Sequence, residues 1–411
     1  MKTNTKFQTV IQKRLFITIG LILLIRIGTF LPIPGINHSD LAFYLQHHSI
    51  AKSLASTFSG NKTFVIGVFT LNIFPYINAS ILVQLLTGFY PKLAKLRKEG
   101  DLEGSRKIDR LTRLITFIIA IIQSTSLAFY LKQIIFDWNY TLAIEIVFWL
   151  TTGAMIILWL SEAITDYGLG NGASLLIYIN IISNLPNFTK TIIFENDSNV
   201  DFISKIIVIL LLFISLYGIV LLQEGARIIP LVSSKQLNQS SRQDSITNYL
   251  PLRFNQAGVM PIILTTTILV IPAYISNLGL IPQLNFGFLK FIYWIWYFAL
   301  ILLFSVFYAS VVLNPKDISD QLQKMAVTIP GIRPGIQTTF YLKQVMQRVT
   351  LVGASMLASL VIIPIFVEST LNINNLNGLS STSLLILAGV ISDLAQEVKN
   401  IYYSNIYSNM Y

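Results

Sequence analysis

The sequence contains no cysteine and little charge. Of its 411 residues 54% are hydrophobic and 12% are charged, whereas soluble domains average roughly 25% charged residues. Without cysteine there is no disulfide, no thiolate metal ligand and no cysteine nucleophile. We therefore expect an integral membrane protein rather than a soluble enzyme.

Histidine is rarer still. The three copies, His38, His47 and His48, lie in one polar stretch, and no His-Glu-x-x-His pattern occurs. The sequence also has no Gly-x-x-x-x-Gly-Lys-Ser/Thr loop for nucleotide phosphates. These absences predict no metal site, no cofactor, no catalytic residue and no enzyme activity, so any driving force would come from a partner.

Long apolar runs are what the sequence does have. A helix crosses a hydrocarbon core of about 30 Å with about 20 mainly apolar residues. Backbone polar groups in lipid must pair internally, which favours helices here because the alternating short strands of a barrel are not seen. The ten predicted spans are 15–33, 66–88, 111–132, 142–163, 173–190, 203–223, 257–277, 292–313, 348–368 and 380–398.

The basic residues lie unevenly along the chain. The net charge is +10, but Lys and Arg flank the apolar runs and do not stripe a soluble face, which indicates membrane topology rather than nucleic-acid binding. With ten spans, the side that holds both termini collects 22 of the 29 Lys and Arg residues, the other side six, and Arg26 lies inside the first span. The positive-inside rule then places both termini on the cytoplasmic side or its equivalent.

Three segments do not fit a plain series of spans. Residues 50–65 are mildly apolar, rich in Ser and Ala, and too short to cross. They predict either a re-entrant half-helix beside a water-filled cavity or an interfacial loop, and composition leaves both open. The basic-side loops at about 224–256 and 314–347 are long enough to dock a large partner, although they could also be simple connectors.

Seven motifs occur in order and resemble the SecY family of protein-translocase channel subunits over nearly the whole chain. They are RIGTFLPIPGI (26–36), NIFPYINASILVQLL (72–86), KLRKEGDLEGSRKIDRLTR (95–113), WLSEAITDYGLGNGASLLI (159–177), NQAGVMPII (255–263), LNPKDISDQLQK (313–324) and IPGIRPGIQT (329–338).

The resemblance implies an all-α polytopic membrane protein with ten transmembrane helices in two inverted pseudo-symmetric halves of five. The N-terminal half would cover 1–190, with a re-entrant plug at about 50–65. A hinge loop at 191–202 and a C-terminal half at 203–411 would follow. The halves would enclose an hourglass pore, with a lateral gate between the second and third helices of one half and the seventh and eighth of the other.

The resemblance also assigns residues to the pore. An apolar ring suits a channel for unfolded protein, because a hydrophobic constriction can dewet and close around a passing chain. Any single isoleucine is more often a packing or lipid-facing residue, so these assignments depend on the motif alignment. The six ring positions are Ile73, Ile77, Ala173, Ile177, Ile263 and Ile386, of which the small alanine departs from the pattern.

Plug and gate positions follow in the same way. The plug would centre on Phe58, Ser59 and Gly60. Polar residues within spans would hold the lateral gate through weak interhelical bonds, although ordinary helix packing explains them equally well. The gate residues are Asn78, Gln84, Gln123 and Thr265. Pro75 is expected to loosen its helix by removing a backbone donor.

The cytoplasmic loops would dock the ribosome, the SecA motor or both. Arg333 lies between two Pro-Gly pairs, and Arg242 and Arg253 lie in the other long loop. A fixed guanidinium suits phosphate or carboxylate recognition. Further partners implied by the resemblance are SecE-like and SecG-like small subunits, preprotein substrates and the lipid bilayer. Arg26, at intramembrane depth, is expected to have a structural role.

Two rival functions share some of these features. A secondary transporter also uses inverted repeats, but it needs a charged site at mid-membrane depth, and the spans offer almost no paired acids and bases. An intramembrane protease needs a Ser-His or Asp pair, and no histidine lies in a span. The abundance of Ile, Asn, Lys, Phe and Tyr indicates an AT-biased genome, which favours a plastid-encoded protein of the thylakoid membrane over the plasma membrane of an AT-rich bacterium.

Overall fold

The fold is mainly helical, in agreement with the predicted class. The computed structural model describes residues 2–34, 67–90, 93, 102–132, 138–194, 202–233, 248–256, 258, 260–262, 264–265, 287–312, 314–370 and 381–410. The chain forms two compact units, one of Met1–Asp197 with Asn374–Tyr411 and the other of Ser198–Ile373. These units are defined by contact and not by symmetry, so the two inverted halves stay a prediction.

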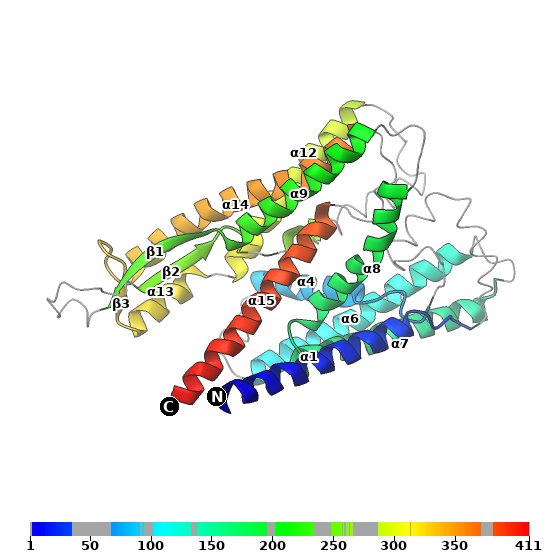
Figure 1. Cartoon of the computed structure of the whole chain (residues 1–411), viewed down its shortest axis with the longest axis horizontal. Helices are drawn as coiled ribbons and strands as arrows, with labels where there is room; N and C mark the ends of the chain where they lie inside the picture. The colour runs from blue at the N-terminus through cyan, green and yellow to red at the C-terminus, as the bar shows by residue number, and fades with distance from the viewer. Residues whose placement is uncertain are drawn as a thin grey trace. The chain divides into compact units, whose positions relative to one another are not determined.

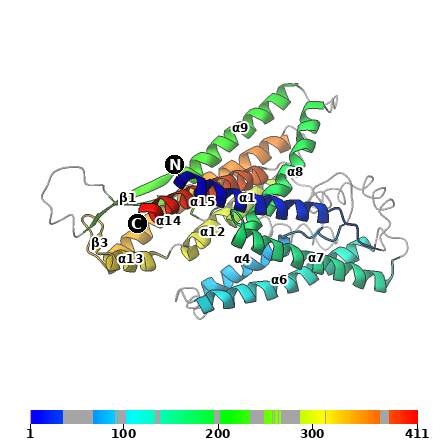
Figure 2. The ribbon, with the colours of Figure 1, turned by 60° about the horizontal axis from the view of Figure 1, so that its bottom comes forward.

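The first unit is a bundle of long helices. In it α4 and α7 both pack on α6, α1 packs on α7 and α15, and α8 packs on α7 and α15 (Figures 1 and 2). The helices are α1 (Lys2–Gly28), α4 (Phe74–Phe89), α6 (Leu102–Leu131), α7 (Tyr140–Tyr167), α8 (Gly172–Phe194) and α15 (Ser381–Met410). Large apolar side chains such as Phe16, Ile144 and Trp159 are exposed, as expected of helices that face lipid.

The core of the first unit gathers where α6 and α7 meet the segment before α4. Small residues, Ala120, Ala128 and Ala154, are buried there beside Leu71 and Ile146. Small side chains let helix backbones approach closely, which is how helices pack when lipid removes the hydrophobic driving force between them.

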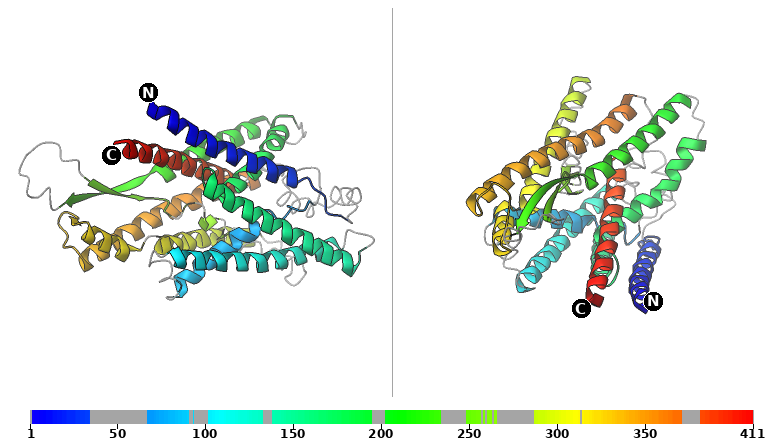
Figure 3. Two further views of the ribbon diagram at one scale, coloured as in Figure 1. Left: turned by 90° about the horizontal axis from the view of Figure 1, so that it is seen from below. Right: turned by 60° about the vertical axis from the view of Figure 1, so that its left-hand side comes forward.

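The second unit combines helices with a small sheet. Its α9 and α12 each pack on α14 (Figure 3). Its elements are α9 (Phe202–Glu224), β1 (Ala226–Ser233), β2 (Asn248–Arg253), α12 (Gly287–Val312), α13 (Pro315–Lys324), β3 (Val327–Thr328) and α14 (Ile336–Thr370). The strands lie in the order β2-β1-β3. Both pairings are antiparallel, with Ile229 opposite Leu250 and Val232 opposite Thr328.

Most predicted spans coincide with helices, and nine of the ten overlap a helix given above. The remaining predicted span, 257–277, lies largely outside the described residues. Of its residues that are described, 260–262 and 264–265 are helical. Within the described part of the chain, four stretches are long and apolar enough to cross a membrane: Glu103–Phe129, Tyr140–Tyr167, Trp294–Lys324 and Ile336–Pro364. Gly172–Ser183 and Phe213–Glu224 are shorter apolar helices.

Two helices begin elsewhere than the sequence predicts. α14 starts at Ile336 rather than near 348 because its first turns pack on the sheet. α4 starts at Phe74 rather than at 66 because Gly67 forms a β-bridge with Pro32. The expectation that Pro75 loosens α4 is wrong. Pro75 lies in the first turn, where backbone N–H groups have no intrahelical acceptor to lose.

Candidate pore, gate and docking elements

Two predicted ring residues open α4. Ile73 caps the helix in the right-handed helical region, at φ −86° and ψ −2°, and the N–H of Ile77 donates to its carbonyl oxygen at 3.1 Å. The side chain of Asn72 accepts from the Ile73 N–H at 2.8 Å and fixes the start of the helix. Ile73 and Ile77 thus lie one turn apart, and both are buried.

Three more ring positions lie on the packed helices α8 and α15. Ala173 and Ile177 occupy the first two turns of α8, Ile386 lies in the second turn of α15, and all three are half-buried. The sixth position, Ile263, lies outside the described residues, as do the plug residues Phe58, Ser59 and Gly60. The structure therefore places five of the six ring positions on or at the start of α4, α8 and α15 in the first unit, and the plug stays a prediction.

Ala173 and Ile177 follow a turn whose backbone is held by hydrogen bonds. Residues 168–172 read GLGNG, and the first N–H groups of α8 are capped by side chains. The Gly172 N–H donates to Thr165 Oγ1 at 3.0 Å, and the Ala173 N–H donates to Asn171 Oδ1 at 3.0 Å. Sequence reasoning quoted this stretch only as a family motif and missed its role as a cap.

The predicted gate residues differ in how far their hydrogen bonds are satisfied. Thr265 is fully buried and donates to the Pro261 carbonyl at 2.7 Å, within its own helical segment. Gln84 Nε2 donates to Ser80 Oγ at 3.2 Å, whereas the Oε1 atoms of Gln84 and Gln123 are buried without a hydrogen-bond partner among the described residues. Asn78 is half-buried on α4. The packed pair α4 and α6 therefore holds two buried, unused amide acceptors.

The predicted docking loop is held in one conformation by its neighbours. Thr338 Oγ1 donates to the Arg333 carbonyl at 2.9 Å, and Ser319 Oγ of α13 donates to the Gly335 carbonyl at 3.1 Å. Gly331 and Gly335 have φ values of +81° and +103°, which side chains with a Cβ rarely adopt. The Arg333 side chain is exposed beyond this loop, so it projects from a fixed base.

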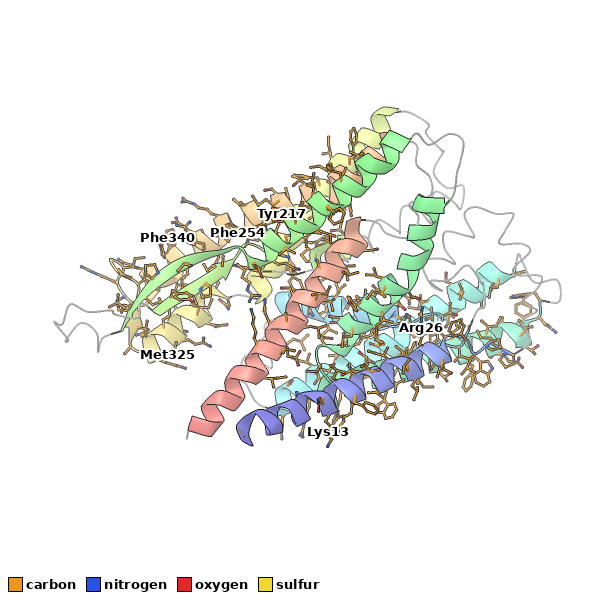
Figure 4. All side chains as sticks on the ribbon, viewed as in Figure 1. Lys13, Arg26, Tyr217, Phe254, Met325 and Phe340 are labelled. Atoms are coloured by element: carbon orange, nitrogen blue, oxygen red, sulfur yellow. The ribbon has the colours of Figure 1, made fainter. Side chains whose placement is uncertain are left out.

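A small apolar core supports that loop. β1, β2, α13 and the first turns of α14 bury a common cluster of side chains: Ile229, Leu231, Leu252, Leu322, Ile329, Leu342, Val345, Met346 and Val349. The described parts of both long basic-side loops thus pack into one folded element, which a simple connector would not do. Arg253 lies exposed at the end of β2, and Arg242 lies outside the described residues. Phe254 marks the junction of this sheet with α9 and α14 (Figure 4).

One ion pair joins two helices of the first unit. Arg113 of α6 and Glu162 of α7 form an ion pair, with Nε and Oε1 2.8 Å apart, and both side chains are partly exposed. Exposed pairs of this kind contribute about 0–1 kcal/mol, so the pair aligns two helices more than it stabilises them. Arg26 lies near the end of α1 and is half-buried (Figure 4), and its structural role stays a prediction.

Two comparisons with sequences agree. The SecY family model matches residues 67–395. A protein translocase subunit SecY from Trieres chinensis is 58% identical over 412 residues, with 97% of each chain covered. One from Guillardia theta is 40% identical over 422 residues, with 99% of each chain covered. The alternative of a small-solute transporter finds no support in these relatives.

Solved structures show the same fold at low identity. A SecY channel studied for its plug domain and closed state superposes with a TM-score of 0.66 at 17% identity, covering 97% of this chain and 94% of its own. Sec61 in the canine ribosome-channel complex gives a TM-score of 0.61 at 16% identity, with the same coverage. With a family model that matches most of its length and relatives that match nearly all of it, this multi-pass membrane chain belongs to the SecY family.

Proposed function

We propose that this chain is the central pore-forming subunit of a Sec protein translocase. It acts as a passive channel that conducts unfolded preproteins across a membrane and releases transmembrane segments through a lateral gate. The observation that supports this most directly is the match to the SecY family over residues 67–395. That range includes all of the predicted ring, gate and docking residues.

The ring closes the idle channel by its apolar character. Water leaves a narrow apolar constriction, and ions then cannot cross, whereas a polypeptide displaces the side chains. Ile73, Ile77, Ile177 and Ile386 supply branched side chains on α4, α8 and α15, and Ile263 would add one more. The small Ala173 widens its sector of the ring.

The plug and gate complete the closed state. Phe58, Ser59 and Gly60 would lie under the ring on the non-cytoplasmic side, where small residues permit displacement. Deleting residues 53–63 should then leave a leaky but working channel, and unchanged ion conductance would count against the plug. At the gate, the unused acceptors of Gln84 and Gln123 are available to a new donor, together with Asn78 and Thr265. Each such bond contributes about 0.6–2 kcal/mol, weak enough for a signal sequence to replace.

Docking on the cytoplasmic face supplies the energy that this chain lacks. Arg333 on its fixed loop, with Arg253 and Arg242 of the other loop, would contact a ribosome, a SecA motor or both. The fold shared with Sec61 of a ribosome-channel complex supports the ribosome as one of them. SecE-like and SecG-like small subunits would complete the complex within the bilayer.

We place the channel in the plastid thylakoid membrane, with both termini on the stromal side. The relatives from Trieres chinensis and Guillardia theta come from algae that carry plastids, and the composition indicates an AT-biased genome. The uneven distribution of Lys and Arg along the chain supports the orientation.

Reconstitution tests the function. The chain, purified with its small subunits, is placed in liposomes with a labelled secretory precursor and either a motor with ATP or a translating ribosome. We expect part of the precursor to become resistant to added protease only when the motor or ribosome is present. Uptake of a small solute without any protected precursor would refute the proposal.

A further inference from the structure

The GLGNG turn, Gly168–Gly172, lies directly before two of the six ring positions. Gly172 is the first residue of α8, and Ala173 and Ile177 follow within two turns. A helix rises 1.5 Å and turns 100° per residue, so over two turns it is effectively rigid. Whatever fixes the turn therefore also fixes the depth and the facing of both side chains.

The turn is held first by α7. A Cβ atom on Gly172 would lie 2.0 Å from the carbonyl oxygen of Ser161 and 2.8 Å from its carbonyl carbon. Both are backbone atoms, so neither can rotate away. Thr165 Oγ1 donates to the same Ser161 carbonyl at 3.0 Å and accepts from the Gly172 N–H at 3.0 Å. The absence of a side chain at Gly172 thus lets α8 begin in direct contact with the α7 backbone.

The turn is held next by α1, which is distant in sequence. The Leu169 N–H donates to Thr18 Oγ1 at 3.1 Å, and Thr18 Oγ1 donates to the Arg14 carbonyl at 2.6 Å. Thr18 and Leu169 are both buried. A Cβ atom on Gly168 would lie 2.9 Å from the same hydroxyl oxygen. One threonine therefore ties the turn to α1.

The third contact is with α15, the helix that bears the ring residue Ile386. Gly170 has φ +82°, and a Cβ atom there would lie 2.5 Å from Leu394 Cδ2. Three glycines of one five-residue turn thus lie against α7, α1 and α15. The contact of Gly172 is with backbone, whereas those of Gly168 with Thr18 and of Gly170 with Leu394 are with side chains.

We propose that this turn is the positioning element of the apolar ring. It clamps the start of α8 against α1, α7 and α15, and so sets how closely Ala173 and Ile177 approach the constriction. The inference rests on the proposed ring function, and it adds Gly172 and Thr18 to the residues on which the seal of the idle channel depends. A turn that merely connected two helices would affect folding yield but not the leak of the folded channel.

Planar-bilayer recordings on the full chain with its copurifying small subunits test this. Gly172→Ala is expected to raise the ion conductance of the idle channel several-fold, while precursor translocation in liposomes persists. Thr18→Val keeps the side-chain shape and removes only the hydroxyl, so a smaller rise is expected. Gly20→Ala is the matched control. Gly20 lies on α1 like Thr18, and a Cβ atom there would have nothing within 4 Å. The conductance of the Gly20→Ala channel should therefore equal that of the unaltered channel.

One further variant separates this inference from the ring itself. Ile177→Gly removes a ring side chain directly and should raise the leak. If Ile177→Gly leaks but Gly172→Ala and Thr18→Val do not, the positioning role of the turn is refuted. If Ile177→Gly does not leak, the ring assignment fails. If Gly172→Ala cannot be purified, Thr18→Val decides: a raised leak supports the proposal, and an unchanged one overturns it.

Discussion

The folded element beneath the docking loop offers a quantitative test. Leu342 is 0% exposed in the cluster shared by β1, β2, α13 and α14, whereas Phe340, two residues earlier on α14, is 63% exposed. Truncating a buried leucine to alanine removes contacts and leaves a cavity, which costs about 2–5 kcal/mol. An exposed side chain away from such features changes stability by no more than about 0.5 kcal/mol. Leu342→Ala should therefore destabilise this element, and Phe340→Ala should not.

Hydrogen exchange measured by mass spectrometry reports the effect strand by strand. If the element opens as one cooperative unit, a loss of about 3 kcal/mol increases the exchange of β1 and β2 amides roughly 150-fold, since about 1.4 kcal/mol corresponds to tenfold. Exchange in α6 and α7, which belong to the other unit, should not change. Equal exchange of the strands in Leu342→Ala and Phe340→Ala would refute the view that this cluster stabilises the loops.

Three further outcomes follow from the contacts described. Gly353→Ala would place a methyl group 2.0 Å from the carbonyl oxygen of Phe254, the residue after β2, so the melting temperature of the purified channel should fall, as for an overpacked core that loses about 1–3 kcal/mol. An unchanged melting temperature would contradict that packing. Glu162→Gln breaks the half-exposed pair with Arg113 and should cost less than about 1 kcal/mol, a difference that shrinks in high salt; a large, salt-independent loss in thermal melts would argue for a buried pair instead. Thr338→Val releases the carbonyl of Arg333 and should weaken motor or ribosome binding while the guanidinium is still present, and a binding assay that gave equal affinity would show that the loop need not be fixed.

The spans were predictable because run length and backbone satisfaction in lipid are local properties of the sequence. The ring, gate and docking residues came from motif resemblance, and the structure places most of them on described helices and loops. The start of α14 was in principle readable as well. Leu342, Val345, Met346 and Val349 recur at the spacing of one helical face, yet the predicted boundary between the loop 314–347 and the span 348–368 separates Val349 from the other three.

Other features depended on partners distant in sequence. The sheet pairs Ala226 with Arg253 across a long connection, and prolines in both strands weaken the local strand signal. The sequence alone indicates that Gly172 is an ordinary turn glycine. Its close contact with the backbone of Ser161 is visible only in the structure. The clamp formed by Thr18 is equally hidden, because no local pattern shows which buried hydroxyl will meet a turn 151 residues later.

The β-bridge between Pro32 and Gly67, reinforced by the Val68 N–H donating to the Leu31 carbonyl at 3.0 Å, holds the two ends of the intervening stretch side by side. Both anchor points belong to the first unit. For a flexible stretch between fixed ends, a change of about a third in length alters the closure entropy by less than the ~0.6 kcal/mol of a doubling. These two anchors therefore set little entropic penalty on a change in the length of the stretch that contains the predicted plug residues.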